Sequence, residues 1–430
     1  MTLTGRVPLL LLLGLVPVLL RPAMSTVWLW VLVVAAATTL DWWLAPRPAR
    51  LGLGRHPSPP VRLGEESAST LTVTNSGRRA VRALVRDAWQ PLAGARDNRH
   101  RVRLAPDEQA TLHTPLLPRR RGDLAALGVT VRVRGPLGLA CRQQTRQVPG
   151  TLRCLPGFPS RRHLPSRLAR LRDLDGRAAV RVRGQGTEFD SLREYVRGDD
   201  VRSIDWRASA RSRQVVVRTW QPERDRRVVL VLDTSRTSAG RVHDVPRLDP
   251  AMDAALLLAA LATRAGDRVD FVAGDRVLRS QLRLPGRREV VTTLQDAMAD
   301  LEPVIAEADW RALTTAVTRL GRQRALVVLL TSLEPEAVEQ SMLPVLGMLL
   351  RHHRVVVASV EDPELVAMAS ARGDLDQVYG AAAAEQAMAR RGHTEQLLRT
   401  LGADVVAATA SALAVELADH YLLLKARGLL

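Results

Sequence analysis

Short apolar runs alternate with helical patterns through the carboxyl-terminal half of the chain, and this alternation limits the possible folds more than any other feature. The expected strands lie at residues 228–232, 269–273, 325–331, 355–360 and 405–408. The expected helices lie at residues 249–264, 290–301, 337–350 and 381–401, with a further one closing the chain. Valine-rich runs of this length are typical of strands covered on both faces. The order of elements predicts an α/β domain over residues 226–430, with a mostly parallel sheet and helices on both sides.

The loop after the first of these strands is a candidate metal site. Asp233, Ser235 and Thr237 bring together one carboxylate and two hydroxyl groups, at the edge of the sheet where ligands of open α/β folds gather. Hard oxygens of this kind suit Mg²⁺ or a similar cation. A single formal charge would hold such an ion weakly unless Glu334 or a carboxylate of a partner completes the shell. The alternative is that Asp233 only orders its own loop.

A polar stretch at residues 184–213 precedes this domain and alternates acidic clusters with arginines. Phe189, Tyr195 and Trp206 lie among the charges, although aromatic residues make up only 3% of the chain. Ordinary linkers contain few aromatic residues and rarely pair their charges so evenly. Two interpretations are compatible: an arginine–carboxylate network that clamps the stretch to the domain behind it, and a docking face for a partner. The candidate partner-binding residues are Arg193, Tyr195, Asp199, Arg202, Asp205, Trp206 and Arg211.

A long motif within this stretch consists of Gly186, Phe189, Leu192-Arg193, Tyr195, Gly198-Asp199, Arg202, Ile204-Asp205-Trp206 and Ser209-Ala210-Arg211. It resembles the signature of the bacterial family called "domain of unknown function fifty-eight". The resemblance implies a membrane-anchored protein with a von Willebrand factor A-like domain of Rossmann type. It also implies an association with MoxR-type AAA+ ATPases and a role as a chaperone or assembly factor.

The resemblance extends to the Asp233 loop. Its Asp-x-Ser-x-Thr spacing is similar to the Asp-x-Ser-x-Ser loop of von Willebrand A domains, which implies a metal-ion-dependent adhesion-like site for Mg²⁺. After the strand at residues 325–331 the family usually has an aspartate, where this chain has Ser332. The implied metal site is therefore degenerate.

Two apolar runs begin the chain, at residues 7–20 and 24–40, and Pro17 interrupts the first. The first run alone would suit a signal peptide, but a second apolar segment follows it directly. We therefore expect a hairpin of two transmembrane helices within residues 1–55. Only Arg21 lies at its tip, whereas the other flanking arginines lie at its base, at Arg6, Arg47, Arg50 and Arg55. The positive-inside tendency then predicts soluble domains in the cytoplasm, anchored to the inner membrane.

The region between the apolar runs and the α/β domain divides into two further parts. Short alternating runs separated by turn residues predict an antiparallel β-sandwich of immunoglobulin-like type at residues 56–155. Residues 156–225 form a basic connector that contains the signature motif. Leu164, Leu168 and Leu171 recur at helical spacing and predict a short amphipathic helix. That helix would lie either on anionic lipid headgroups or against the next domain.

The net charge of +18 comes almost entirely from arginine, with Lys425 as the only lysine. The arginines are spread along the chain and few aromatic side chains are available to stack on bases, so we do not expect a nucleic-acid partner. No GxSxG, HExxH or P-loop motif is present, and we expect no enzymatic activity. The expected function is a membrane-anchored adaptor that binds client proteins beside a MoxR-type ATPase. A structural or envelope-biogenesis protein and a basic nucleic-acid-binding protein are the alternatives.

Overall fold

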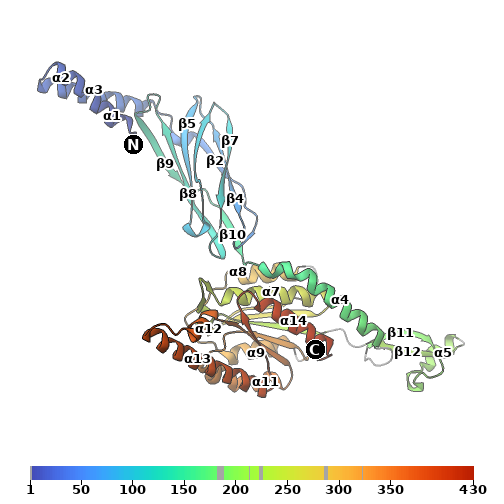
Figure 1. Cartoon of the computed structure of the whole chain (residues 1–430). Coiled ribbons are helices and arrows are strands. Elements are labelled where there is room, and N and C mark those ends of the chain that lie inside the picture. Colours follow the sequence, from blue (N-terminus) through green and yellow to red (C-terminus); the bar gives the residue numbers. More distant parts are fainter. Residues whose placement is uncertain (1, 182–187, 213, 222–225, 285–288, 322) are drawn as a thin grey trace. The chain divides into compact units, whose positions relative to one another are not determined.

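The computed structural model describes residues 2–181, 188–212, 214–221, 226–284, 289–321 and 323–430. The chain forms two compact units, Met1–Leu155 and Pro156–Leu430. Figure 1 shows helices and a set of long strands in the first unit, and a sheet covered by helices in the second. Each unit is built around its own buried clusters.

The first unit begins with strand β1 (Thr2–Leu3) and three apolar helices, α1 (Arg6–Leu13), α2 (Leu15–Leu20) and α3 (Met24–Leu44). The side chain of Trp30 in α3 donates a hydrogen bond to the carbonyl of Leu10, at 3.0 Å. Among the described residues, one helix near the N-terminus, continuing from Met24 to Arg50, is long and apolar enough to cross a membrane. The first apolar run is divided at Gly14 into α1 and α2, and Pro17 lies in the first turn of α2, where proline is tolerated.

Two sheets complete the first unit. The strands are β2 (Leu51–Arg55), β3 (Val61–Arg62), β4 (Ser67–Asn75), β5 (Val81–Trp89), β6 (Arg99–Leu104), β7 (Gln109–Leu116), β8 (Gly122–Arg134), β9 (Ala140–Arg146) and β10 (Thr151–Leu155). One sheet has the order β2-β4-β7, and the other joins β1, β9, β8, β10, β3, β5 and β6. All pairs of strands are antiparallel except β3 with β10, which is a departure from the expected antiparallel pattern.

Alternate residues of both sheets face one shared cluster, which includes Leu71, Val85 and Val131. This arrangement follows from the period of two in strands such as β4 and β5, whose side chains are buried and exposed in turn. Strand β2 begins within the region expected to form the helical hairpin. Arg55, which sequence analysis placed among the membrane-flanking arginines, is instead buried against Asp87.

Asp41 joins the end of α3 to the second sheet. Its buried carboxylate accepts hydrogen bonds from the backbone N–H groups of Leu137, Leu139 and Ala140, at 2.7, 2.7 and 2.8 Å. Arg142 in β9 donates to the carbonyl of Trp42 at 3.0 Å and lies over its ring. The last turn of the membrane-length helix is therefore fixed to strand β9 by charge-assisted bonds.

The second unit contains a six-stranded sheet in the order β17-β16-β13-β18-β19-β20. Its strands are β13 (Arg227–Asp233), β16 (Arg268–Gly274), β17 (Leu278–Leu284), β18 (Leu326–Leu330), β19 (Arg354–Glu361) and β20 (Asp404–Thr409). All pairs are parallel except β16 with β17. Its longer helices are α4 (Leu164–Arg181), α7 (Leu248–Arg264), α8 (Val290–Ala299), α9 (Trp310–Leu320), α11 (Leu343–Leu350), α12 (Pro363–Ser370), α13 (Leu375–Thr400) and α14 (Leu413–Ala426).

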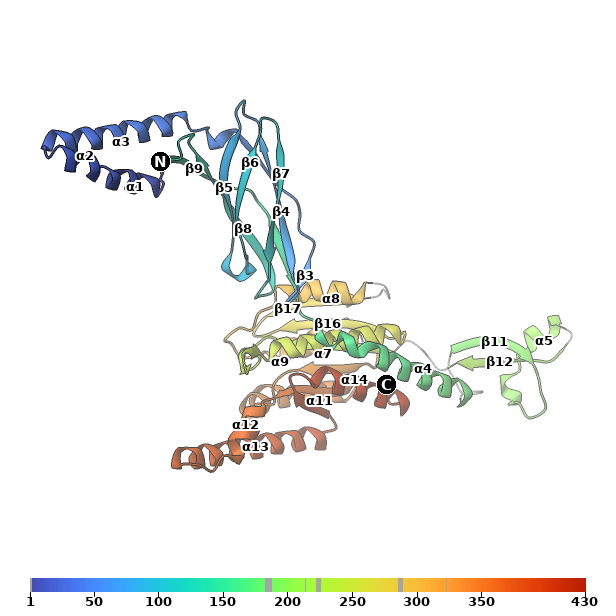
Figure 2. The same cartoon turned by 45° about the horizontal axis from the view of Figure 1, so that its top comes forward.

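Helices cover both faces of this sheet (Figure 2). One buried cluster joins the sheet to α4, α7, α8 and α14, and the other joins it to α9 and α11. The expected alternation of strands and helices is observed, with β17, α9 and α12 in addition. Helix α7 ends as expected, because Gly266 adopts a left-handed conformation (φ 83°) that closes the last turn. The helix expected at residues 337–350 is instead divided by a π-helical turn at Val338–Met342.

Helix α4 belongs to this second unit. Leu171 is buried in the cluster under α7 and α14, and Leu164 and Leu168 pack against it. Arg167 and Arg170 form ion pairs with Asp419 of α14, at 3.1 and 2.7 Å. The apolar face of this helix therefore lies against the α/β domain. Of the two alternatives predicted from sequence, the packing supports this one and not a helix on lipid headgroups.

Candidate functional site

Asp233 ends strand β13 and is almost fully buried, with 1% of its surface exposed. Its carboxylate accepts hydrogen bonds from the backbone of Ser235 at 2.8 Å, the hydroxyl of Thr237 at 2.9 Å and the hydroxyl of Thr331 at 2.6 Å. The first two donors follow from the Asp-x-Ser-x-Thr spacing. The third comes from the end of β18, the neighbouring parallel strand. The arrangement therefore closes the loop onto the next strand.

Burial raises the pKa of Asp233, and the hydrogen bonds from Thr331 and from the Ser235–Thr237 loop oppose that shift. A carboxylate withdrawn from water is costly unless donors surround it. Here the donors are neutral hydroxyl and amide groups, and no cationic side chain contacts the carboxylate among the described residues. The proton is therefore held more tightly than by an ordinary aspartate.

Arginines cover the mouth of this loop. Arg236 pairs with Glu307 and, at 3.4 Å, with Glu334. Arg247 contacts Glu334 at 3.1 Å and donates to the hydroxyl of Ser332 at 3.0 Å. The cavity lined by Asp233, Ser235 and Thr237 has a volume of about 10 Å³, which is close to the space of one water molecule.

The contacts around Asp233 disfavour the divalent cation suggested by sequence. The oxygens of Asp233 already accept from three donors, and Glu334 is engaged by two arginines. Within the part of the chain that the structure describes, no group of three or more His, Cys, Asp and Glu side chains could hold a metal ion. The guanidinium of Arg247 supplies positive charge beside Ser332, which replaces the aspartate usual in the family. The metal site at Asp233, Ser235 and Thr237 therefore stays a prediction, which these contacts disfavour.

The signature motif forms a small folded module at residues 188–221. Strands β11 (Glu188–Glu194) and β12 (Val216–Gln221) pair antiparallel. A 3₁₀ turn at Val201–Ser203 and helix α5 (Trp206–Ser212) lie between them. All seven candidate partner-binding residues belong to this module. Gly186, which also contributes to the motif, lies outside the described residues.

Three of the seven residues stabilise the module itself. Arg193 pairs with Asp199 at 2.5 Å, and Asp199 also accepts from the backbone of Val196 at 2.9 Å. These bonds close a turn in which Gly198 has a positive φ of 114°. Asp205 caps α5 by accepting from the backbone of Arg207 and Ala208, each at 3.0 Å.

The pKa values of the two aspartates reflect these contacts. The Arg193 side chain and the Val196 backbone hold the pKa of Asp199 below its usual range. The Ala208 backbone and then Arg218, which pairs with Asp205 at 2.8 Å, lower the pKa of Asp205. Both ion pairs lie inside the module. The expected clamp onto the α/β domain is absent from the ion pairs that the described residues make.

The remaining residues leave their side chains available. For the described part of the module, the structure shows no side-chain hydrogen bond or ion pair at Tyr195, Arg202, Trp206 or Arg211. Trp206 is 67% exposed, and Val196 and Val201 are each 60% exposed. The module therefore has an internal polar framework and presents an indole ring, apolar side chains and guanidinium groups to solvent.

Residues 191–399 match a family model described as "Protein of unknown function DUF58". This match supports the DUF58 family for the segment. The family resemblance given by the signature motif is thereby confirmed. A comparison with curated proteins finds no match.

Among the solved structures similar to this chain, two cover a share of it that is comparable with the length of the DUF58 segment. A conserved hypothetical protein BatB from Bacteroides thetaiotaomicron is 13% identical, with coverage of 46% of this chain and 98% of that one and a TM-score of 0.29. The SpRpn10 VWA domain is 10% identical, with coverage of 45% and 94% and a TM-score of 0.25. A PapD-like domain of human CEP192 is 16% identical, with coverage of 26% and 88% and a TM-score of 0.20. Scores this low add nothing to the topology described above.

The DUF58 segment holds the Asp233 loop and nearly all of the signature module. Three residues at the loop were not predicted from the sequence: Thr331, Arg236 and Arg247. Thr331 had a local signal, because it follows directly after the buried run of β18. Arg236 and Arg247 had none, since their partners Glu307 and Glu334 lie far along the chain.

Proposed function

We propose that this chain is a non-enzymatic adaptor, anchored in the inner membrane, that binds other proteins through the signature module. It would act beside a MoxR-type AAA+ ATPase, with its soluble domains in the cytoplasm. The exposed surface of the module carries this proposal. Trp206 with Arg202 and Arg211 combines the residue types that most often anchor protein interfaces.

The membrane anchor rests on the N-terminal helices. Helix α3 is long and apolar enough to span a bilayer, and the α1–α2 run packs back along it. We propose that both cross the membrane as a hairpin. Arg6 and Arg47 then lie on one side and Arg21 on the other, which favours a cytoplasmic location for the rest of the chain. Green fluorescent protein fused after Leu430 should fluoresce, and alkaline phosphatase at the same point should be inactive. The reverse pattern would contradict the orientation.

The Asp233 loop contributes a different kind of surface to this proposal. Its buried carboxylate is satisfied from within, so the outward-facing groups are the arginines and carboxylates of Arg236, Arg247, Glu307 and Glu334. A partner's carboxylate would compete with Glu307 or Glu334 for these guanidinium groups. No bound ion is needed for such a contact.

The test of the adaptor proposal is a pull-down of the full chain from membranes that also contain a MoxR-type ATPase. The variant combines Arg202→Glu with Trp206→Ala, because neither side chain supports the module. We expect at least a tenfold loss of captured ATPase, as for an interface hot spot. Arg193→Glu is unsuitable, since it also breaks the pair with Asp199.

The matched control is Arg311→Glu, which changes the same charge at an exposed position of α9. Circular dichroism of each purified chain verifies that the folded content is unchanged. Undiminished capture by the double variant would show that this surface does not bind the ATPase. Failure of the parent chain to capture the ATPase would instead favour the envelope protein that acts without this partner.

A further inference from the structure

The two edges of the α/β sheet differ in how they are protected. Strand β17 at one edge carries Arg279 and Arg283, and its pairing with β16 includes a register shift. Charged side chains and irregular pairing are common means of preventing another strand from joining an edge. Strand β20 at the other edge pairs regularly with β19, and its one charged residue, Asp404, lies at its start and is paired with Arg354. Its central residues, Val405 to Ala408, are small or apolar, without a charge or a proline.

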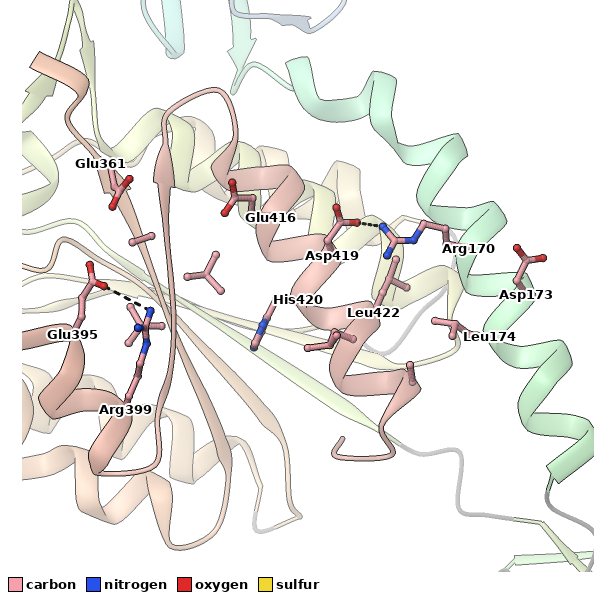
Figure 3. Close-up of a pocket in the computed structure, with 15 residues that line it drawn as sticks. Arg170, Asp173, Leu174, Glu361, Glu395, Arg399, Glu416, Asp419, His420 and Leu422 are labelled. Atoms are coloured by element: carbon pink, nitrogen blue, oxygen red, sulfur yellow. Dashed lines mark hydrogen bonds and ion pairs between the residues drawn. The ribbon is translucent and has the colours of Figure 1, made fainter. Parts of the chain in front are cut away.

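The free edge of β20 lies in a groove. Figure 3 shows Glu395 and Arg399 of α13 on one side of the strand, and Glu416, Asp419 and His420 of α14 on the other. The groove has a volume of about 850 Å³, and Val405 to Ala407 form part of its lining. Arg170 and Asp173 of α4 extend the α14 side. The groove is therefore large, and strand β20 lies along it.

The backbone of β20 is available on this side. In a parallel sheet each strand directs its N–H and C=O groups alternately to its two neighbours, and β20 has only β19 as a neighbour. Among the described residues, the backbone of Val405 to Ala408 makes no hydrogen bond outside this pairing. These outward groups would pair with an added strand.

The charges of the groove favour a cationic occupant. Two carboxylates, Asp173 and Glu416, are exposed and form no ion pair among the described residues. The other carboxylates are already paired with arginines, for example Asp419 with Arg167 and Arg170. The chain as a whole carries a net charge of +18, but beside this open strand edge it presents two carboxylates without a paired cation within the described ranges. These carboxylates would repel an acidic partner.

We propose that the β20 groove binds an extended, basic segment of a partner protein, which adds to the sheet as a further strand. Backbone bonds to β20 would supply affinity, and contacts of its cationic side chains with Asp173 and Glu416 would supply selectivity. A segment that matches Asp404–Thr409 spans roughly 20 Å, at about 3.3 Å per residue. The site lies three strands away from β13 and does not depend on the adaptor proposal.

Three fluorescent peptides test this site against the full chain in detergent, by anisotropy at physiological salt. One alternates arginine and valine over ten residues, and one alternates glutamate and valine. The third is the arginine–valine peptide with every second backbone amide methylated. One edge of this peptide then has no N–H groups to donate hydrogen bonds to β20. We expect the first to bind, and the other two to bind at least tenfold more weakly. Equal affinity of the methylated peptide would overturn strand addition, and equal affinity of the acidic peptide would overturn the charge selectivity.

A variant with Asp173→Arg and Glu416→Arg should weaken the arginine–valine peptide at least tenfold. The matched control is Glu339→Arg with Asp376→Arg, which reverses two exposed carboxylates elsewhere; Asp376 lies in the first turn of its helix, as Glu416 does. The control should change affinity less than twofold. Similar affinities for the two variants would overturn the proposal.

A photo-crosslinking version of the same peptide places the site on the unmodified chain. Crosslinks should map to residues 404–409 and to the flanking turns of α13 and α14. Crosslinks confined to other regions, or an absence of binding by the parent chain, would overturn the assignment. Neither result affects the pull-down test of the signature module.

Discussion

The Arg55–Asp87 ion pair gives the sharpest quantitative prediction about stability. The two side chains are 2% and 0% exposed and form two parallel bonds, of 3.0 and 2.6 Å. Trp89 donates to the same carboxylate at 3.1 Å, and Arg55 lies over its ring. Burial alone would raise the pKa of Asp87, but Arg55 and then Trp89 hold it below its usual range. Each of these two buried charges is therefore compensated by the other.

Removal of one partner leaves a buried charge without compensation, which typically costs about 3–5 kcal/mol. We expect this loss for Asp87→Leu and for Arg55→Met. The double variant replaces both charges with apolar groups of similar volume, and it should recover most of the stability. In equilibrium constants, each single loss corresponds to a factor between about a hundred and a few thousand.

Cysteine labelling measures this effect in the intact protein. The chain has two cysteines, and Cys141 and Cys154 are both buried in the first unit. Burial raises the pKa of Cys154 to about 11, so a maleimide at neutral pH reacts only after the unit opens. Labelling of the single variants should therefore accelerate by the factors given above. Labelling rates of the single variants within fivefold of the parent would refute the reasoning. A double variant whose loss of stability equals the sum of the two single losses would also refute it.

Three further predictions concern the site and the anchor. Because the pKa of Asp233 is raised from its ordinary value of 3.8, its contribution to stability is complete below that value and is lost as pH rises through the folded pKa. In urea titrations, the free energy of unfolding of Asp233→Asn should therefore rise relative to that of the parent as pH increases above 4. A difference between the two that is independent of pH would contradict the raised pKa. Asp205→Ala removes the cap of α5, so amide exchange of Trp206–Ser212 should accelerate, whereas Arg202→Glu should leave it unchanged. Asp41→Leu leaves three backbone donors without a partner, each costing about 1–3 kcal/mol when buried, and labelling of Cys141 should accelerate by at least tenfold; unchanged labelling would show that α3 is not held by this contact.

Local patterns were sufficient to predict the parallel strands of the second unit. Strands β13, β18 and β19 are continuous valine-rich runs, because both of their faces are covered. Strand β17 was missed because an exposed edge strand alternates charged and polar residues and has no apolar run. Helix α9 had a usable signal, since Trp310, Leu313, Val317 and Leu320 recur at helical spacing and are all buried.

The candidate site was predictable only where its residues are close in sequence. The Asp233–Thr237 contacts follow from spacing within one loop. The contacts that disfavour a metal ion join residues that are 85 to 98 positions apart, as in Arg247 with Ser332 and Thr331 with Asp233. Such pairs depend on which strands become neighbours, and a single sequence contains no local signal for that order.

The Asp41 contact has a mechanical consequence for the anchor. A helix joined to a domain through a slack linker can tilt in its bilayer without turning the domain. In the proposed anchor, the last turn of α3 is bonded directly to β9, so no slack segment separates the helix from the sheets. A change in bilayer thickness that tilts α3 would rotate the two sheets with it.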